Sequence, residues 1–438
     1  MSKQEHTPIK SAIDRQRETR EKEHQQEIGK SVGYFQLLRQ NPNFRWLWGG
    51  QVVSLLGDWF NLIASAILVA ELTGSGLALG ILFTIRMLAP FFMAPIAGIC
   101  ADRYNRKHLL IITDLARAVI VVGFLFVRDA GDLWLLYALT TLLFGVSGFF
   151  SPARSAILPD LTSPQELGTA NTLGAATWSV MLAVGAAIGG LTTGLFGSQT
   201  AFIIDGFTFA ISAGLLLKIR LPRSASETAA TSTRAKSSVL RYMFQHPDIL
   251  FVALHKAAIS LLLSSGIQVI LVEIAKNYFV IGVGGALSLG MMYCMNGIGS
   301  GIGPILARRW TGDRDKPLRV SISFGYVIAA IGIAIMAPVS TLGTVLFGGF
   351  VRSVGGGITW VFSTQLLLQR APNEIRGRIF GTEFALFTLM GGASSLITGA
   401  LMDRFQLQVI LWGMGALTLI PALLWSLWQR HHSRVVQK

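Results

Sequence analysis

The sequence predicts an all-α polytopic membrane protein, with twelve transmembrane helices in two pseudo-symmetric six-helix bundles. The 438 residues are 52% hydrophobic and only 14% charged, whereas a soluble globular chain has about 25% charged residues. From Phe44 onward the chain is a succession of apolar stretches of about 20 residues, the length that crosses a bilayer core of about 30 Å. The formal net charge is +14, and the basic residues are distributed around these stretches.

The chain begins with a polar segment of mixed charge, as in KSAIDRQRETREKEHQQE. This segment is too long and too charged for a signal peptide. We therefore interpret residues 1–43 as a polar cytoplasmic tail that could be helical near residues 14–27. Cys100 and Cys294 both lie in apolar surroundings, which indicates neither a disulfide framework nor a metal cluster.

The apolar stretches define the predicted spans in order. A large soluble α-helical protein with buried helices would rarely carry so many consecutive stretches of this length, so that class is rejected. The predicted spans are 46–71, 77–99, 108–127, 133–153, 169–193, 199–218, 249–272, 283–306, 320–338, 342–368, 379–401 and 407–428.

The basic residues set the orientation of these spans. With the N-terminus in the cytoplasm, 30 of the 37 Lys and Arg residues fall in cytoplasmic segments and only three in external loops. Four others, Arg86, Arg117, Lys256 and Arg352, lie inside spans. This is the positive-inside bias, and it places both termini in the cytoplasm of a cell with a bacterial-type inner membrane. The positive charge is thereby explained by topology, and nucleic acid is not an expected partner.

A flexible linker divides the spans into two sets of six. Residues 219–248 contain the run RSASETAATSTRAKSS, a composition typical of linkers. The predicted domains are therefore an N-terminal bundle at 44–218, this cytoplasmic linker, a C-terminal bundle at 249–429 and a short cytoplasmic tail at 430–438. An offset of about 205–208 residues aligns the ends of the second and eighth spans, as expected of a duplicated transporter.

The loop after the second span carries a motif, Gly98-x-x-x-Asp102-Arg103-x-x-Arg106-Lys107. With twelve spans and a basic central loop, it resembles the signature of the major facilitator superfamily. Asn105 stands where that signature has Gly, and Asn tolerates a left-handed turn better than most residues. QVVSLLGDWF, FFSPARSAILPDL and RGRIFG resemble the branch with enterobactin exporters and macrolide efflux pumps, a branch that also resembles lysophospholipid transporters.

The resemblance implies a cytoplasmic gate at this loop. An acid on a short turn can dock against the positive N-terminal end of a helix in the other half and hold the inside closed. The partner we expect is the eleventh span. Alternatively, the motif only anchors the loop on the cytoplasmic side. The gate residues are Gly98, Asp102, Arg103 and Arg106, together with Arg376 and Arg378 at the start of the eleventh span.

Ionisable residues inside the spans are candidates for ion coupling, because a charge at the bilayer centre costs about 2.5–3.5 kcal/mol. At about 1.5 Å per residue, Asp58 and Arg86 lie about 20 and 24 Å from the cytoplasmic side and could pair. Asp58 could then take up a proton and release it, or the two could be a permanent structural pair. Glu383 could be a second titrating site, or a partner for the basic residues that begin its span.

Other charges in the spans suggest structural roles. Asp114 and Arg117 share a helix face, and we expect them to form a network with Arg154. Asp205 is interpreted as structural. Lys256 is expected to reach the interface by snorkelling.

The resemblance also implies a central cavity lined by the first, fourth, seventh and tenth spans. Each polar or aromatic candidate there could instead serve packing, and Arg352 could bind an anionic substrate group or balance a carboxylate. The candidates are Trp59, Asn61, Gln268, Arg352, Trp360 and Gln365. The fifth span carries AVGAAIGGLTTG, whose small residues allow close helix packing; it resembles the antiporter motif of exporters but lacks its usual Pro.

These features predict a secondary active transporter and not an enzyme. No Walker A sequence or convincing metal spacing occurs, so we expect no cofactor and energy from an ion gradient, most simply H⁺. The expected function is export of an amphipathic small molecule or drug by alternating access and proton antiport, by a monomer in the bilayer. The alternatives are transport of a lysophospholipid or other lipid-like substrate, and a non-transporting receptor or scaffold.

Overall fold

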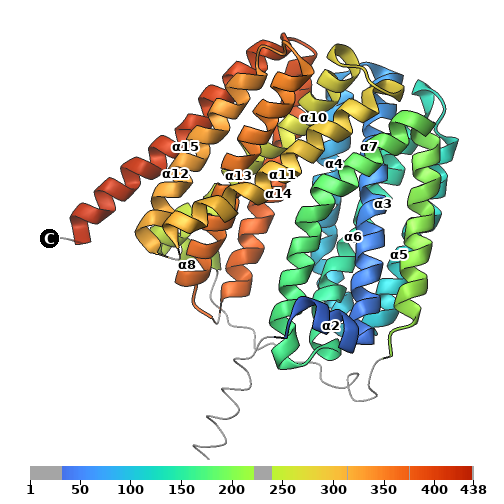
Figure 1. The fold of residues 1–438 in the computed structure, drawn as a ribbon, viewed down its shortest axis with the longest axis horizontal. Helices are drawn as coiled ribbons and strands as arrows, with labels where there is room; N and C mark the ends of the chain where they lie inside the picture. The colour runs from blue at the N-terminus through green and yellow to red at the C-terminus, as the bar shows by residue number, and fades with distance from the viewer. Residues whose placement is uncertain (1–31, 221–238, 313, 374, 437–438) are drawn as a thin grey trace, which may run out of the picture.

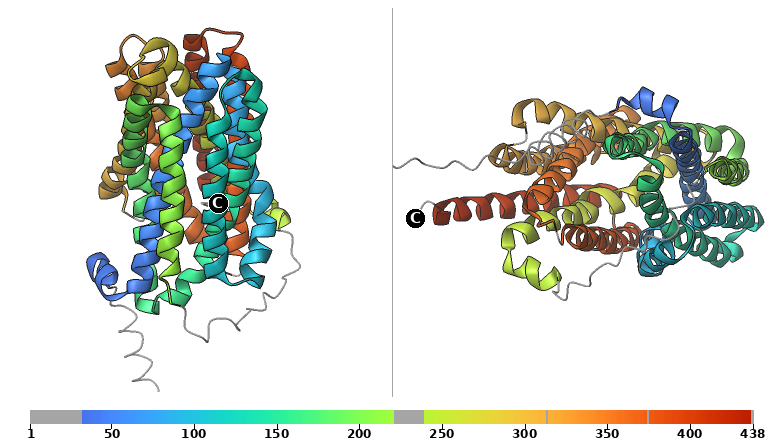
Figure 2. Two further views of the ribbon diagram at one scale, coloured as in Figure 1. Left: turned by 90° about the vertical axis from the view of Figure 1, so that its right-hand side faces the viewer. Right: turned by 90° about the horizontal axis from the view of Figure 1, so that it is seen from below.

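The computed structural model describes residues 32–220, 239–312, 314–373 and 375–436, and all regular structure in them is helical. Two helical bundles stand side by side, an N-terminal one from α2 to α7 and a C-terminal one from α8 to α15 (Figures 1 and 2). The α-helices are α2 Tyr34–Gln40, α3 Pro42–Thr73, α4 Gly76–Arg103, α5 Arg106–Gly123, α6 Leu133–Leu161, α7 Pro164–Leu217, α8 Val239–Gln245, α9 Pro247–Ile259, α10 Ser265–Glu273, α11 Ala286–Thr311, α12 Asp315–Met336, α13 Leu342–Arg370, α14 Arg376–Met402 and α15 Leu407–Val436. Shorter 3₁₀ or π segments are η1 Phe124–Phe126, η2 Ala130–Asp132, η4 Ser260–Ser264, η5 Ile274–Tyr278 and η6 Val283–Gly285.

The twelve-span prediction agrees with this architecture. Among the described residues, 10 helices are long and apolar enough to cross a membrane. One of them, α7, covers two predicted spans and bends at Gly197, whose φ of 80° and ψ of 169° only glycine adopts readily. The predicted span 283–306 corresponds to α11, which is long enough but less apolar.

Side chains next to the helix ends explain where several helices begin. Asn41 accepts a hydrogen bond from the Phe44 backbone N–H at 2.9 Å and starts α3, with Pro42 in the first turn. Ser163 and Glu166 form a reciprocal capping box at the start of α7. Each cap satisfies amides that the first turn of a helix leaves unpaired.

The outer surface is apolar, as a lipid-facing surface requires. Large side chains on both bundles remain more than half exposed, among them Phe92, Trp134, Phe207 and Phe347. Exposed apolar area of this extent is unusual for a soluble monomer. We conclude that the chain is a multi-pass membrane protein.

The two bundles meet at one end of the molecule and separate at the other (Figure 1). We call the end that carries α2 the α2 end, and the opposite one the far end. At the far end α7 packs on α11, and a Cβ atom on Gly190 would lie 2.5 Å from the Cα of Gly290. The backbones of the two bundles are therefore in direct contact there, as small residues permit.

Part of the predicted polar tail is packed against the N-terminal bundle. Leu37 of α2 is fully buried in a cluster with Phe44 and Leu47, and Thr169 donates a hydrogen bond to the Val32 carbonyl at 2.8 Å. The helix that we expected near residues 14–27 lies outside the described residues, as does most of the linker.

Candidate functional site

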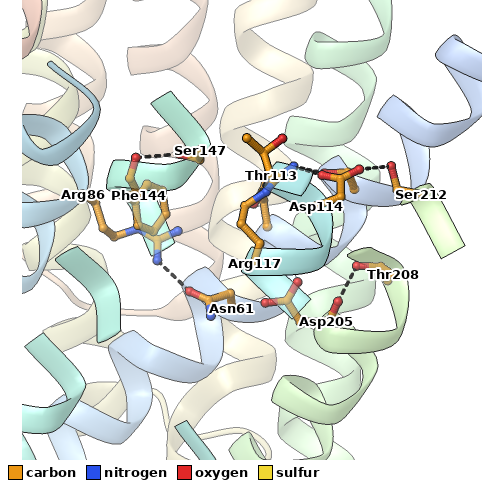
Figure 3. A network of polar contacts seen from close by, with 12 residues as sticks. Asn61, Arg86, Thr113, Asp114, Arg117, Phe144, Ser147, Asp205, Thr208 and Ser212 are labelled. Atoms are coloured by element: carbon orange, nitrogen blue, oxygen red, sulfur yellow. Dashed lines mark hydrogen bonds and ion pairs between the residues drawn. The ribbon is translucent and has the colours of Figure 1, made fainter. Parts of the chain in front are cut away.

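A network of charged side chains lies inside the N-terminal bundle, with Arg117 of α5 at its centre (Figure 3). Arg117 forms an ion pair with Asp114, one turn earlier on the same helix, and donates to Ser54 Oγ of α3 at 3.2 Å. Its guanidinium also lies 4.2 Å from the ring centre of Phe209 and 5.1 Å from that of Phe150. Cation–π contacts of this kind hold a desolvated guanidinium in place.

Asp114 is fully buried between α5 and α7, and Ser212 Oγ donates to it at 2.5 Å. The expected pairing of Asp114 with Arg117 is therefore present. Arg154 does not join them: its guanidinium packs against Gly174 of α7, and no described hydrogen bond or ion pair links it to Asp114. The spacing of three residues on one helix was enough to predict the pair of Asp114 with Arg117. The position of Arg154 could not be predicted, because it depends on how α6 packs against the other helices.

Asp58 of α3 is paired with Arg117, not with Arg86 as expected. Its Oδ1 lies 3.9 Å from Arg117 Nη1, and 35% of its side chain is exposed against 3% for Arg117. Arg86 instead donates to Asn61 Oδ1 at 3.1 Å and stacks on Phe144 at 4.2 Å (Figure 3). Counting residues along the helices suggested that Asp58 and Arg86 lie at a similar depth in the bilayer. It could not show that the side chain facing Arg86 would be Asn61.

Asp205 of α7 belongs beside this network, and the sequence analysis did not select it. It is fully buried, and its carboxylate faces the Asn61 amide without a well-formed hydrogen bond. The Asn61 amide nitrogen next to it likewise makes no well-formed hydrogen bond (Figure 3). The usable signal was its position as the single ionisable residue between the bend of α7 and the end of that helix, in a membrane-spanning segment.

A second buried pair lies in the C-terminal bundle. Lys256 Nζ of α9 lies 2.8 Å from Glu383 Oε2 of α14, and both side chains are buried. The ammonium also lies 4.7 Å from the ring centre of Trp360 and 5.6 Å from that of Phe380. Lys256 therefore does not snorkel to the interface, because a carboxylate and two aromatic faces replace water around it. Glu383 is paired with Lys256 and not with the arginines that begin α14.

Arg352 of α13 is held by the protein itself. Its guanidinium donates to the carbonyl of Leu263 and, at 3.1 Å, to Ser353 Oγ, which in turn donates to Asn296 Oδ1 at 3.2 Å. Leu263 lies in the π-helical segment η4, where widening of the turn frees a carbonyl. Arg352 therefore stabilises the π-helical break between α9 and α10. Of its guanidinium nitrogens, only Nε remains unpartnered.

Trp59 lies between the two bundles. Its ring makes an edge contact with Tyr293 of α11 at 5.5 Å, and it packs on the glycine face of α7 at Gly185 and Gly189. Of the other expected cavity residues, Asn61 is buried, whereas Gln268, Trp360 and Gln365 are partly exposed. Trp360 meets Phe387 of α14 edge-on at 5.2 Å.

The contact expected between the loop after α4 and the start of α14 is not made in this structure. Asp102 and Arg103 are exposed at the α2 end of α4, and Asp102 makes no hydrogen bond or ion pair among the described residues. Arg106 pairs with Asp160 of its own bundle at 2.6 Å. At the start of α14, Arg376 donates to the Ala371 carbonyl at 3.2 Å.

Asn105 in the gate motif is not in a left-handed turn. Its φ of −60° and ψ of 114° are extended, and its side chain accepts a hydrogen bond from the His108 N–H at 3.2 Å to cap α5. A capping side chain, rather than positive φ, therefore explains Asn at this position.

Comparison with known proteins identifies the family. Residues 47–391 match the sequence profile of the Major Facilitator Superfamily. The chain belongs to this superfamily. It is 25% identical over 363 residues to YfiS of Bacillus subtilis, an uncharacterized MFS-type transporter, covering 81% of this chain and 85% of YfiS. It is 27% identical over 367 residues to BacE of Bacillus amyloliquefaciens, a candidate bacilysin exporter, covering 81% and 88%.

Solved transporter structures share the fold of this superfamily member. A variant of the nucleoside transporter NupG has a TM-score of 0.67 at 14% identity, covering 89% of this chain and 99% of NupG. A bacterial homologue of the human lysosomal transporter Spinster, solved inward-facing and occupied, has the same TM-score and identity, covering 87% and 96%. The profile match and the related transporters show that the chain is a membrane transporter of the superfamily and not an enzyme.

Proposed function

We propose that this transporter exports an amphipathic small molecule across the cytoplasmic membrane in exchange for protons. The observation that carries the proposal is the partly exposed carboxylate of Asp58, joined through Arg117 to the buried Asp114. Protonation of an accessible acid breaks its ion pair with a buried charge network. The loss of that ion pair changes the contacts between the helices that carry the network. Similarity to a candidate bacilysin exporter supports the outward direction.

The orientation follows from the basic residues, which assign the α2 end and both termini to the cytoplasm. The bundles touch at the far end and part at the α2 end (Figure 1). In this orientation we interpret the structure as the inward-facing state of the proposed alternating-access cycle. The outward-facing state would require the bundles to close at Asp102 and to open at the far end.

Proton exchange would proceed through Asp58. In the proposed inward-facing state an ionised Asp58 would pair with Arg117, to which it lies 3.9 Å away. Arrival of a proton from the outside in the opposite state would neutralise the carboxylate and release Arg117. Asp205 is fully buried in α7 and faces the Asn61 amide of α3. We assign Asp205 as a second proton carrier that lies behind Asp58 in the same bundle.

The substrate site we propose lies between the bundles at Trp59 and Trp360, with the buried Tyr293 packed behind Trp59. Flat aromatic faces beside the partly exposed carboxylate of Asp58 suit an amphipathic molecule with a cationic or polar group. The protein would act as a monomer in the bilayer, with no cofactor and with the proton gradient as its energy source.

The test is an efflux assay in cells that lack their own drug pumps. Cells expressing the wild-type chain are compared with empty-vector cells for retention of ethidium, Hoechst 33342, erythromycin and a fluorescent lysophosphatidylcholine. We expect faster loss of at least one amphipathic compound, abolished when an uncoupler collapses the proton gradient. Loss of the lysophospholipid alone, unaffected by the uncoupler, would favour a lipid transporter; equal retention of all four would contradict export.

A further inference from the structure

Asp403, just after α14, is bound to the start of α4 in the other bundle. Its Oδ1 accepts a hydrogen bond from the Gly76 N–H at 2.6 Å. Its Oδ2 accepts from Ser75 Oγ at 3.0 Å and from the Leu77 N–H at 3.2 Å. One carboxylate from the C-terminal bundle thus satisfies amides that the first turn of α4 leaves unpaired, at the positive end of the helix dipole.

Glycines bring the two helices close enough for this contact. A Cβ atom on Gly76 would lie 2.8 Å from the Gly399 carbonyl, and one on Gly80 would lie 2.6 Å from the Ser395 carbonyl. Contacts below 3.0 Å are not tolerated without movement of backbone, so these positions have room only for glycine at this separation.

The same residues occur in both helices in the same order. A constant offset of 301 residues in the sequence matches five positions of α4 with five identical residues, three of them in α14 and two directly after its end. The two helices run in opposite directions between the ends of the molecule, so the repeat is inverted. The pairs are Gly76 with Gly377, Gly80 with Gly381, Gly98 with Gly399, Asp102 with Asp403 and Arg103 with Arg404.

At the α2 end the matching contact is not made. A Cβ atom on Gly98, Gly377 or Gly381 would meet nothing within 4 Å, although their counterparts at the far end are in backbone contact. The residues for a second contact of the same design are thus present and apart.

We propose that Asp403 is an external latch, the mirror image of the cytoplasmic gate at Asp102, and that the two latches close alternately. The inference rests on the proposed alternating-access cycle. With Asp403 docked, the outside is closed; when the bundles rock, Gly98 would pack on Gly377 and Gly381. Asp102 would then accept hydrogen bonds from the Gly377 and Arg378 amides.

The two latches need not be equally strong. In the external latch a serine hydroxyl, Ser75, supplies the third hydrogen bond. Its counterpart at the offset of 301 residues is Arg376, which could offer Asp102 a charge-assisted hydrogen bond instead. Each aspartate therefore stabilises one end state, and removing one should shift the population toward the state that the other holds.

The test measures distances between spin labels by pulsed electron paramagnetic resonance in lipid vesicles. The labels replace two exposed side chains at the cytoplasmic ends of opposite bundles, through Tyr104→Cys and Trp310→Cys in a Cys100→Ser, Cys294→Ser background. We expect Asp403→Ala to lower the ratio of long to short distances about threefold to tenfold, the effect of one charge at a helix end. Asp102→Ala should raise the ratio, and the double variant should return it toward the wild-type value.

Two further variants keep the test independent of folding defects. Asp132→Ala removes an external carboxylate that caps only its own loop, through the Arg128 N–H at 2.9 Å, and should leave the ratio unchanged. Gly399→Ala should shift it in the same direction as Asp403→Ala. Two distance populations with an unchanged ratio in both Asp403→Ala and Gly399→Ala would overturn the latch. A single population in the wild type and in every variant would contradict alternating access itself.

Discussion

Lys256 and Glu383 form an ion pair of 2.8 Å that joins α9 to α14 inside the C-terminal bundle. Trp360 and Phe380 lie against the ammonium group, so the pair is shielded on its open sides by aromatic rings. Glu383 Oε1 has no hydrogen-bond partner among the described residues, which leaves the carboxylate able to accept one more hydrogen bond.

The first prediction concerns this pair. Glu383→Gln leaves a buried ammonium without its counter-charge and should destabilise the fold by about 3–5 kcal/mol. Replacing both partners, by Lys256→Met with Glu383→Leu, should recover most of that loss, since a well-packed apolar pair is often neutral. Thermal unfolding of the purified variants in detergent checks both statements. A double variant less stable than Glu383→Gln would show that the pair itself, and not the stranded charge, sets stability.

The second prediction separates Asp58 from the rest of the substrate path. Asp58→Asn keeps the side-chain volume but cannot exchange a proton, so gradient-driven efflux should stop while exchange of labelled for unlabelled substrate continues. Counterflow and gradient-driven flux in proteoliposomes measure the two activities. Asp315→Asn is the matched control, because Asp315 is an exposed carboxylate that pairs with Arg319 and Arg370 at the surface. Unchanged gradient dependence in Asp58→Asn would exclude Asp58 as the carrier.

The third prediction concerns the buried carboxylate of Asp205. Asp205→Asn exchanges a buried acid that lacks a well-formed hydrogen bond for a neutral side chain of similar size, so thermal stability should be unchanged or higher. Gradient-driven efflux should nevertheless fall about tenfold or more, because the second proton carrier is gone. A variant with normal efflux would make Asp205 a structural residue, as the sequence alone suggested.

The fourth prediction tests the contact between the bundles. Gly290→Val inserts a side chain where a Cβ atom would lie 2.7 Å from the Gly190 Cα, and should destabilise this state by about 1–3 kcal/mol. Gly301→Val on the same helix meets nothing within 4 Å and is the control. Thermal unfolding should separate the two variants; equal unfolding temperatures would contradict the close contact of α7 and α11.

The sequence was sufficient for what depends on one helix at a time. Apolar length predicted the spans, and the spacing of three residues predicted the pair of Asp114 with Arg117. The orientation assigned from the basic residues stays a prediction. Pairs between different helices could not be predicted in this way. Lys256 and Glu383 are 127 residues apart. Asp58 of α3 pairs with Arg117 of α5 because of how these two helices are rotated against each other. The apolar length of a span does not show which side chains of two neighbouring helices face each other.

The contact of Asp403 with α4 could not be predicted from the sequence for a different reason. The repeat is visible in the sequence, but aligning the halves in parallel, at an offset of about 205–208 residues, pairs the second span with the eighth. The repeat that matters pairs the second with the eleventh, which runs in the opposite direction. Only contact between Asp403 and Gly76 showed that this second comparison has a structural meaning.

Proton coupling is the central claim, and one measurement tests it most directly. Purified protein is placed in proteoliposomes that enclose a pH-sensitive dye, and the compound that cells export most strongly is added under an imposed substrate gradient. The account predicts that substrate flux drives protons in the opposite direction, and that Asp58→Asn abolishes the proton movement. Substrate flux at the same rate in both proteins, with no proton movement in either, would contradict it.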